Sequence, residues 1–365
     1  MSDIDDKRLA ENLKAVKRRH IVTAAVTGAS VFALAGVPEP AHAQRAQFRF
    51  RLQSFLGPGW AEWETLLPRY AQRINDMSGG RIQIQIFPPA ALVPTFEMLD
   101  GVSRRVIDMA YGAQLYWRGR FPFTQWTWGI PFLFNKVEEY DYLWFEAGLN
   151  DLVTEAFATA GVQFLGPIYS DDWGSTISRR PIRRLDDFRG LRIRSGGIGG
   201  ELWKQFGASI VTLPGEELYT ALSTGVIDGA NWGSPYGMVA TKLHEVAKFY
   251  TGPSIIHADA EDMFINKAAF DGMPKELQVA MLTATRVFAL ERYSYAVGAS
   301  ARAFKTMRDA GVETMVLPPE DVQRLRDLTK ELVPRLAGDD AYTRRALQII
   351  NDTRALLDQW PKGFL

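Results

Sequence analysis

Two stretches of the chain repeat one another at a distance of 120 residues. Residues 97–110 (EMLDGVSRRVIDMA) and residues 217–230 (ELYTALSTGVIDGA) share Glu, Ser, Val, Ile, Asp and Ala in register. Each stretch predicts a helix, a polar break and a short buried strand that begins at Ile-Asp. Chance convergence of two helix-to-strand joints is the alternative explanation. The repeat favours two similar α/β lobes with a cleft between them in which a small ligand would bind.

The N-terminus has the three parts of a secretory signal peptide. A basic region ends at Arg18-Arg19, an apolar stretch covers residues 21–37, and Ala41-His42-Ala43 fits the small-residue cleavage rule. We therefore assign residues 1–43 to the signal peptide and expect a periplasmic protein that begins at Gln44. The paired arginines are compatible with the twin-arginine export route. A retained membrane anchor is the alternative, although the apolar stretch is barely long enough to span a bilayer.

The mature chain has almost no net charge. Removing residues 1–43 leaves 36 of the 42 basic residues and 37 of the 42 acidic residues, a formal balance of −1. This balance argues against nucleic acid or an anionic membrane surface as a partner. The chain has no cysteine, which excludes disulfides and thiolate metal sites. Only His244 and His257 remain, without HExxH or GxSxG spacing, so a catalytic triad or a zinc centre is poorly supported.

Two further motifs have simpler explanations than the chemistry they suggest. The glycine-rich residues 196–200 follow a predicted strand, but Leu202 stands where a dinucleotide-binding loop needs its third glycine. The pairs Asp171-Asp172 and Glu216-Glu217 occupy adjacent positions that point in different directions, so neither pair makes a glycosidase couple. For Glu216-Glu217 we favour negative charge in the first turn of a helix.

Several motifs resemble the substrate-binding subunits of tripartite ATP-independent periplasmic (TRAP) transporters. The matching segments are 191–197 (LRIRSGG), 217–222 (ELYTAL), 225–229 (GVIDG), 231–236 (NWGSPY), 92–94, 189–190 and 263–267. The resemblance covers nearly all of residues 46–335. The Trp-Gly-Ser-Pro-Tyr motif and the long C-terminal extension are most similar to the 2-oxo acid branch of that family.

The resemblance implies an α/β chain with the two-lobed periplasmic-binding-protein fold, hinge segments and long bracing helices. The hinge crossings are expected near residues 165–175 and 230–240. The expected division is lobe 1 at residues 44–165, lobe 2 with its hinge crossings at 166–265, bracing helices that return to the lobes at 266–335, and a C-terminal helical extension at 336–365.

The resemblance also implies a protein that catalyses no reaction. It would bind a small organic acid, a 2-oxo, 2-hydroxy or related monocarboxylate, and deliver it to the small and large TRAP membrane subunits. The alternatives are the binding component of an ATP-driven importer, a sensor, or a secreted hydrolase.

Arg194 is the residue that we expect to hold the ligand's carboxylate. It ends a predicted strand before a glycine-rich turn, where an open α/β lobe exposes its ligand-facing edge. It also matches the carboxylate-binding arginine of the family, and a planar guanidinium donates two parallel hydrogen bonds to a carboxylate. A structural salt bridge to Asp228 or Asp172 is the alternative. The other expected ligand contacts are Asn231, Trp232, Trp173, Tyr116, Trp117, Asp172 and His257.

A departure from the family pattern bears on metal binding. The residue before the tryptophan of the motif is a carboxylate in metal-using members, and here it is Asn231. Trp173 stands where an assisting glutamine is expected. Because a neutral amide weakens a site for a hard cation, we expect no cofactor and no required metal, with Asn231 bonding the acid directly. The alternative is a Na⁺ or Ca²⁺ ion held by Asn231 and the backbone of Trp232.

Residues 339–359 predict an amphipathic C-terminal helix. Its apolar face carries Ala346, Ile349, Ile350 and Leu357 at helical spacing. In relatives of the 2-oxo acid branch an extended C-terminal helix supports a dimer, so we expect a homodimer. Packing of this face on its own subunit is the alternative.

Overall fold

The computed structural model describes residues 46–171, 173–257 and 259–360, so the predicted signal peptide lies outside the described residues. The described chain builds two mixed β-sheets. The first sheet and its helices are here called lobe 1, and its strand order is β2-β1-β3-β10-β4. These strands are β1 (Phe48–Ser54), β2 (Ile82–Phe87), β3 (Met109–Ala113), β4 (Val162–Tyr169) and β10 (Ala260–Asn266).

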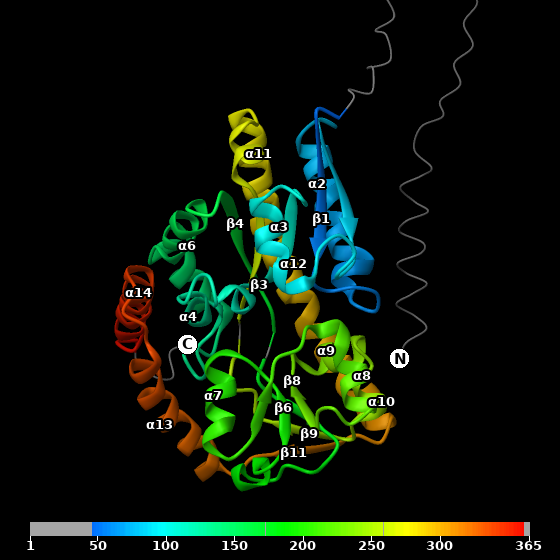
Figure 1. The fold of residues 1–365 in the computed structure, drawn as a ribbon, viewed down its shortest axis with the longest axis vertical. Coiled ribbons are helices and arrows are strands. Elements are labelled where there is room, and N and C mark those ends of the chain that lie inside the picture. Colours follow the sequence, from blue (N-terminus) through cyan, green and yellow to red (C-terminus); the bar gives the residue numbers. More distant parts are fainter. Residues whose placement is uncertain (1–45, 172, 258, 361–365) are drawn as a thin grey trace, which may run out of the picture. The chain divides into compact units, whose positions relative to one another are not determined.

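The second sheet and its helices are here called lobe 2. Its strand order is β11-β9-β5-β8-β6-β7. Figure 1 shows β6, β8, β9 and β11 grouped apart from β1, β3 and β4. The strands are β5 (Thr176–Ser178), β6 (Arg192–Arg194), β7 (Ser209–Val211), β8 (Gly229–Asn231), β9 (Phe249–Gly252) and β11 (Glu313–Val316).

Helices connect and cover these strands. α2 (Leu67–Met77) joins β1 to its parallel neighbour β2 and buries Leu67, Tyr70 and Ile74, so these elements form a β-α-β unit. The other helices of lobe 1 are η1 (Glu62–Leu66), η2 (Thr95–Glu97), α3 (Met98–Ser103), η3 (Gln114–Trp117), α4 (Thr124–Trp128), α5 (Val137–Asp141), η4 (Tyr142–Glu146), α6 (Leu149–Ala158) and α11 (Lys267–Asp271). Those that follow the lobe 2 strands are η5 (Leu185–Phe188), α7 (Gly197–Gln205), η6 (Gly215–Glu217), α8 (Leu218–Ser223), α9 (Pro235–Ala240) and α10 (Leu243–Val246).

One strand lies in a different place from the division expected on sequence. β10 was expected at the end of lobe 2, but it pairs antiparallel with β3 and β4 of the first sheet. All seven of its residues are buried, Glu261 and Asp262 included, so the order of polar and apolar residues does not show which sheet it joins. β11 lies in the segment that was expected to brace the lobes and return to them, and it pairs with β9 at the edge of the second sheet.

The chain passes between the two sheets three times. Two of these passages are adjacent segments, which include residues 173–175 after β4 and residues 253–257 before β10, and the third runs from β10 through the long helix that follows it to β11. Trp173 and Ile256 pair across the two adjacent segments, with backbone hydrogen bonds of 2.6 and 2.9 Å. The first crossing lies within the expected residues 165–175. The second does not lie at the expected residues 230–240, because those residues form the end of β8 and α9 inside lobe 2.

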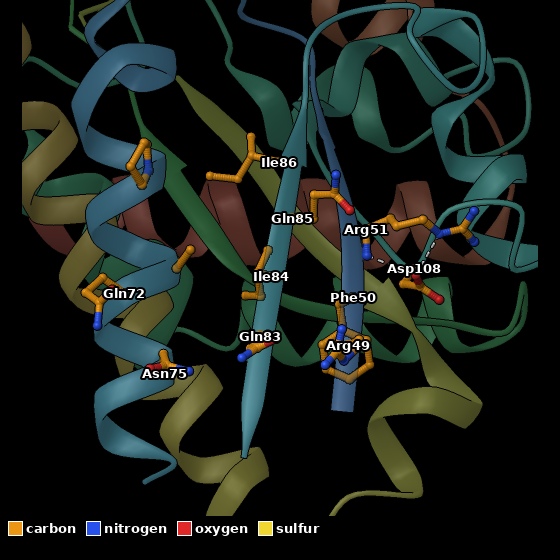
Figure 2. Close-up of a pocket in the computed structure, with 12 residues that line it drawn as sticks. Arg49, Phe50, Arg51, Gln72, Asn75, Gln83, Ile84, Gln85, Ile86 and Asp108 are labelled. Carbon is orange, nitrogen blue, oxygen red and sulfur yellow. Dashed lines mark hydrogen bonds and ion pairs between the residues drawn. The ribbon is translucent and has the colours of Figure 1, made fainter. Parts of the chain in front are cut away.

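The sequence repeat corresponds to two equivalent helix-strand units, α3 with β3 and α8 with β8. In each unit the repeated aspartate holds an arginine of the neighbouring parallel strand. Asp108 accepts from the backbone N and Nε of Arg51 at 2.9 and 3.2 Å, as Figure 2 shows, and Asp228 accepts from the same two atoms of Arg192 at 2.9 and 3.0 Å. The shared contact accounts for the Ile-Asp that begins each buried strand.

The turn between helix and strand needs a left-handed residue in both units. Gly225 adopts a φ of +76° in the second copy, and Arg105 adopts +59° at the equivalent position of the first. An L residue pays a steric cost in this region, so the first copy carries backbone strain that glycine avoids in the second.

Three long helices follow β10. α12 (Lys275–Asp309) packs on β4 and α2 of lobe 1 and on α9 of lobe 2, and Figure 1 shows it running from one group of strands to the other. It confirms the predicted bracing helix. α13 (Pro319–Leu336) packs on α7. None of the helices in the described ranges is both long and apolar enough to cross a membrane.

α14 (Ala341–Leu357) packs on α4 and α6 of its own chain. Ala346 and Ile350 are buried there, and Arg345 forms an ion pair with Glu155 at 2.8 Å. Ile349 and Leu357 stay half-buried. Much of the apolar face proposed for dimerisation is therefore already covered within one subunit.

Candidate functional site

Arg194 lies at the end of β6, and only 7% of its surface is exposed. Its Nε donates to the carbonyl oxygen of Leu213 at 3.0 Å, and its Nη1 donates to that of Asn231 at 3.3 Å. The guanidinium carbon lies 4.5 Å from the ring centroid of Trp232, within the range of a cation–π contact. Since a guanidinium has five N–H donors, these two bonds leave donors unused.

Arg194 has no ion pair with a carboxylate in the part of the chain that the structure describes. One proposed structural partner, Asp228, is occupied by Arg192, whose Nε and Nη2 each donate to it at 3.0 Å. Burial lowers the pKa of Arg194, and the nearby Tyr116 and Glu216 oppose that shift. A buried guanidinium without an acid partner favours an anionic ligand as the missing charge.

A pocket of about 140 Å³ adjoins the guanidinium. Both lobes contribute to its wall, and none of the residues described there is acidic. Two of them, Arg118 and Arg194, are cationic, so the pocket has a positive potential. The lining consists of Phe96, Leu115, Tyr116 and Arg118 from lobe 1, and Arg194, Ser195, Gly196 and Thr212 from lobe 2.

Tyr116 brings a phenol to this pocket from lobe 1. Its ring packs edge-on against Phe96, with centroids 4.8 Å apart. Burial raises the pKa of Tyr116 to about 12, and the charge of Arg194 lowers it. The hydroxyl is buried, and a side-chain hydrogen bond with Arg194 also lowers the pKa, so a protonated phenol lies beside the guanidinium.

Trp232 is the aromatic floor under Arg194. It is 1% exposed and lies edge-on to Trp173, at 5.1 Å between centroids, and to Trp60 of lobe 1, at 6.4 Å. Gly215 is required beneath it, because a Cβ at that position would lie 2.6 Å from the indole. The indole N–H is buried without a partner among the described residues.

Asn231 lies at the end of β8 and takes part in the scaffold. Its Oδ1 accepts from the hydroxyl of Ser195 at 3.4 Å, and its Nδ2 donates to the carbonyl of Ser175 at 3.2 Å. Its backbone oxygen accepts from Arg194. The amide therefore fixes the strand ends around the guanidinium.

The structure does not bring all the predicted residues together. Trp117 packs on Phe264 and donates its N–H to Asp262 at 3.2 Å, inside the core of lobe 1. His257 is half-buried on the second crossing segment and does not line the pocket. Asp172 lies outside the described residues.

The sequence analysis missed several residues at the lobe contact. Glu216 accepts from the hydroxyl of Thr95 at 2.5 Å, which joins the two lobes beside the pocket. Leu115 of lobe 1 lies so close to Gly196 and Gly197 that a Cβ there would meet it at 3.0 and 2.9 Å. The repeat could have pointed to these residues. Phe96, which lines the pocket, and Glu216 occupy equivalent positions just before the two copies.

A second hollow lies within lobe 1, away from Arg194. A groove of about 770 Å³ lies between α2 and the strands β1 and β2, lined by polar side chains such as Gln72, Asn75 and Gln83 (Figure 2). It contains the structural pair of Arg51 and Asp108. No group of three or more His, Asp or Glu side chains that could hold a metal ion occurs in the described ranges.

Solved structures of TRAP periplasmic solute-binding proteins share this fold. One from Pseudoalteromonas atlantica, with bound sodium and pyruvate, has a TM-score of 0.80 and 24% identity over 87% of this chain and 97% of its own. One from Colwellia psychrerythraea, with bound calcium and pyruvate, has a TM-score of 0.78 and 23% identity over 86% and 96%.

Comparison of sequences gives the same grouping. The monocarboxylate 2-oxoacid-binding periplasmic protein of Nostoc sp. is 25% identical over 94% of this chain and 96% of its own. The C4-dicarboxylate-binding periplasmic protein of Rhodobacter capsulatus is 26% identical over 70% and 74%. The model of bacterial extracellular solute-binding protein family 7, DctP, matches residues 62–339. The chain therefore belongs to this family of solute-binding proteins.

Proposed function

We propose that this protein is the periplasmic solute-binding subunit of a TRAP transporter and that it captures a small organic acid between its lobes. The observation that carries the proposal is Arg194, a buried guanidinium with unused donors and no carboxylate partner among the described residues. A ligand carboxylate supplies the missing charge and accepts the remaining hydrogen bonds. The relatives that bind a 2-oxoacid and the structures that contain pyruvate support this class of ligand.

The size of the pocket favours a short acid. The pocket of about 140 Å³ is small beside the roughly 300–1,000 Å³ that is typical of pockets for larger ligands. A 2-oxo or 2-hydroxy monocarboxylate fits this space, with its carboxylate on Arg194 and its 2-oxygen facing the hydroxyl of Tyr116. Lobe closure then excludes water from the charge pair, which strengthens it.

The side chain of Asn231 could offer a metal ion only a neutral oxygen. We propose that the acid binds without a required metal. The amide already bonds Ser195 and Ser175, and a neutral oxygen is a weak ligand for a hard cation. The relatives with bound sodium or calcium make a cation held by Asn231 and the Trp232 backbone the alternative. Binding that survives exhaustive chelation supports the metal-free site, and binding restored only by added calcium or sodium contradicts it.

We also propose two protein partners. The small and large membrane subunits of a TRAP permease would receive the loaded protein. A second copy of this chain would dock through the C-terminal helix, although the burial of Ala346 and Ile350 within one subunit leaves only part of the face available. Removing residues 339–365 should change the subunit count measured by light scattering, and an unchanged count contradicts the dimer.

A thermal-shift screen of organic acids tests the proposal. An acid that binds only the folded chain raises its melting temperature as its concentration rises. We expect pyruvate and related 2-oxo or 2-hydroxy acids to do so, and the corresponding neutral amides to have no effect. A chain that no acid stabilises, or that converts the acid to a product, contradicts the proposed function.

A further inference from the structure

Four carboxylates and one guanidinium are buried together where the crossing segments meet α12. Glu62, Asp259 and Glu261 are fully buried, Asp171 is 6% exposed, and Arg292 is 2% exposed. If all four acids were ionised, negative charges would exceed positive ones by three. Because uncompensated buried charge is very costly, a cluster of this composition binds protons instead.

Arg292 is the centre of the cluster. Its Nε lies 2.9 Å from Glu62, its Nη2 donates to Glu261 at 3.2 Å, and its Nη1 lies 4.0 Å from Asp171. Burial alone would lower the pKa of Arg292, but the carboxylates, Glu261 first, raise it well above its ordinary value. The guanidinium therefore stays charged and compensates one acid.

Asp259 is the acid with the least support. Neither of its carboxylate oxygens has a hydrogen-bond partner in the described part of the chain. Burial raises the pKa of Asp259 well above its ordinary range; Glu261 adds to that shift and Arg292 opposes it. Burial likewise raises the pKa of Glu261 to about 7, against the effects of Arg292 and Tyr111. The other charged or titratable groups that face these acids, or lie beside them in the chain, are Tyr140, Tyr169, Tyr236, Asp262, His257 and Asp172, which follows Asp171 in the sequence.

Tyr236 covers the cluster from lobe 2. Its hydroxyl donates to Glu62 of lobe 1 at 2.8 Å and accepts from the backbone N–H of Ala61 at 2.5 Å. Its ring packs edge-on against Trp60, with centroids 5.2 Å apart. A movement of lobe 2 away from lobe 1 would take this hydroxyl from Glu62 and admit water to the acids, which would change the medium around the cluster.

We propose that closing of the cleft is coupled to the binding of a proton by the acid cluster of Glu62, Asp171, Asp259 and Glu261, and that Tyr236 is the positioning residue that seals it. The proposal rests on the proposed function, since ligand binding is what closes the lobes. It requires no contact between the cluster and the ligand.

The sign of the effect follows from linkage. Acids with a higher pKa in the closed form favour that form at low pH, and the advantage is lost as the pH rises through that higher pKa. Burial in the described structure raises the pKa of Glu261 to about 7. Calorimetry with pyruvate between about pH 5.5 and about pH 7.5 should show affinity falling with pH, by at most about tenfold per unit for each proton. Titrations in buffers of different ionisation enthalpy should show uptake of protons. Equal affinities with no uptake contradict the proposal.

Three variants locate the effect. Tyr236→Phe keeps the ring on Trp60 and removes the hydroxyl, so it should weaken binding and flatten the pH profile. Asp259→Asn should flatten the profile by removing a titrating group. The matched control is Tyr70→Phe, which removes a buried hydroxyl whose partner, Thr285, is neutral. It should leave the profile unchanged, and a control that flattens it equally contradicts the role of Tyr236.

A measurement without ligand separates this inference from the proposed function. If no acid binds at any pH, the proposed function fails, and the cluster is tested by unfolding and by X-ray scattering. The free energy of unfolding of the unmodified chain should fall between about pH 5 and about pH 7 relative to Asp259→Asn, and its radius of gyration should rise with pH. Parallel stability curves and a constant radius contradict the proposal.

Discussion

The two lobes place different side chains at the same position of the same framework. Gln53 stands two residues after Arg51 on β1, and Arg194 stands two residues after Arg192 on β6. Gln53 donates to the carbonyl oxygen of Val93 at 2.8 Å, and Arg194 donates to the carbonyl oxygen of Leu213 at 3.0 Å. Leu213 is equivalent to Val93, because the two residues are separated by the repeat distance of 120.

The difference lies in what each side chain has left to donate. The amide oxygen of Gln53 also accepts from the backbone N–H groups of Leu92 and Val93, so the amide is occupied and neutral. The guanidinium of Arg194 makes the equivalent hydrogen bond, and it still has N–H donors without an acceptor and a positive charge. The same framework therefore satisfies its own hydrogen-bonding groups in lobe 1, whereas in lobe 2 it leaves a charged donor that can bind an anion.

The largest expected effect comes from making lobe 2 resemble lobe 1. Arg194→Gln should fold cooperatively and lose about 2 to 5 kcal/mol of binding free energy for pyruvate, the range for removing one partner of a buried charge pair. Arg192→Gln is the control, because that arginine is bound to Asp228. Calorimetry on both variants decides. Affinity within about threefold of the parent for Arg194→Gln removes this residue from the site.

The reverse change tests the closed framework of lobe 1. Gln53→Leu removes the hydrogen bonds to the half-buried backbone groups of Leu92 and Val93, so the free energy of unfolding should fall by about 1 to 2 kcal/mol. Urea unfolding measures it, with the exposed Gln83→Leu as the matched control. A loss of affinity beyond that of stability would show that Gln53 also acts on the ligand.

A smaller effect is expected where the repeats turn from helix to strand. Gly225→Ala forces an L residue into a φ of +76° and should cost about 1 kcal/mol, since the nearest atom is the movable end of Arg179. Arg105→Gly in the other copy relieves the same strain but raises the conformational entropy of the unfolded chain. The two effects oppose one another, so the free energy of unfolding should change by less than about 0.5 kcal/mol. Thermal unfolding that ranks the two variants the other way contradicts the equivalence of the turns.

The smallest effect concerns the repeated aspartate. The side-chain hydrogen bond from Arg192 holds the pKa of Asp228 below its ordinary value. Stability from this pair is therefore present above the ordinary aspartate range of about 4 and is lost as the pH falls through the lowered pKa. Asp228→Asn should be slightly less stable than the parent at about pH 7, and the difference should vanish in acid. Because Arg192 is half-exposed, a large difference at neutral pH would be unexpected.

The framework was predictable from local patterns, and its long-range pairings were not. The resemblance implied the bracing helix α12, and the repeat predicted both helix-strand units. The polar residues of β10 are buried along with its apolar ones, so its pattern does not indicate which sheet it joins. At the site, the position of Arg194 followed from its strand end, whereas the contact of Glu216 with Thr95 depends on how the lobes meet, which no local pattern encodes.

The interleaved strand order has a consequence for the order in which the chain is made. Lobe 1 lacks the strand between β3 and β4 until residue 266 has been synthesised, by which point β5 to β9 already exist. Lobe 2 in turn waits for its edge strand at residues 313–316. A nascent chain cannot complete one lobe before it starts the other, and such distant pairings form slowly. The interleaved strands thus make completion of each lobe depend on residues that are synthesised after the other lobe has begun.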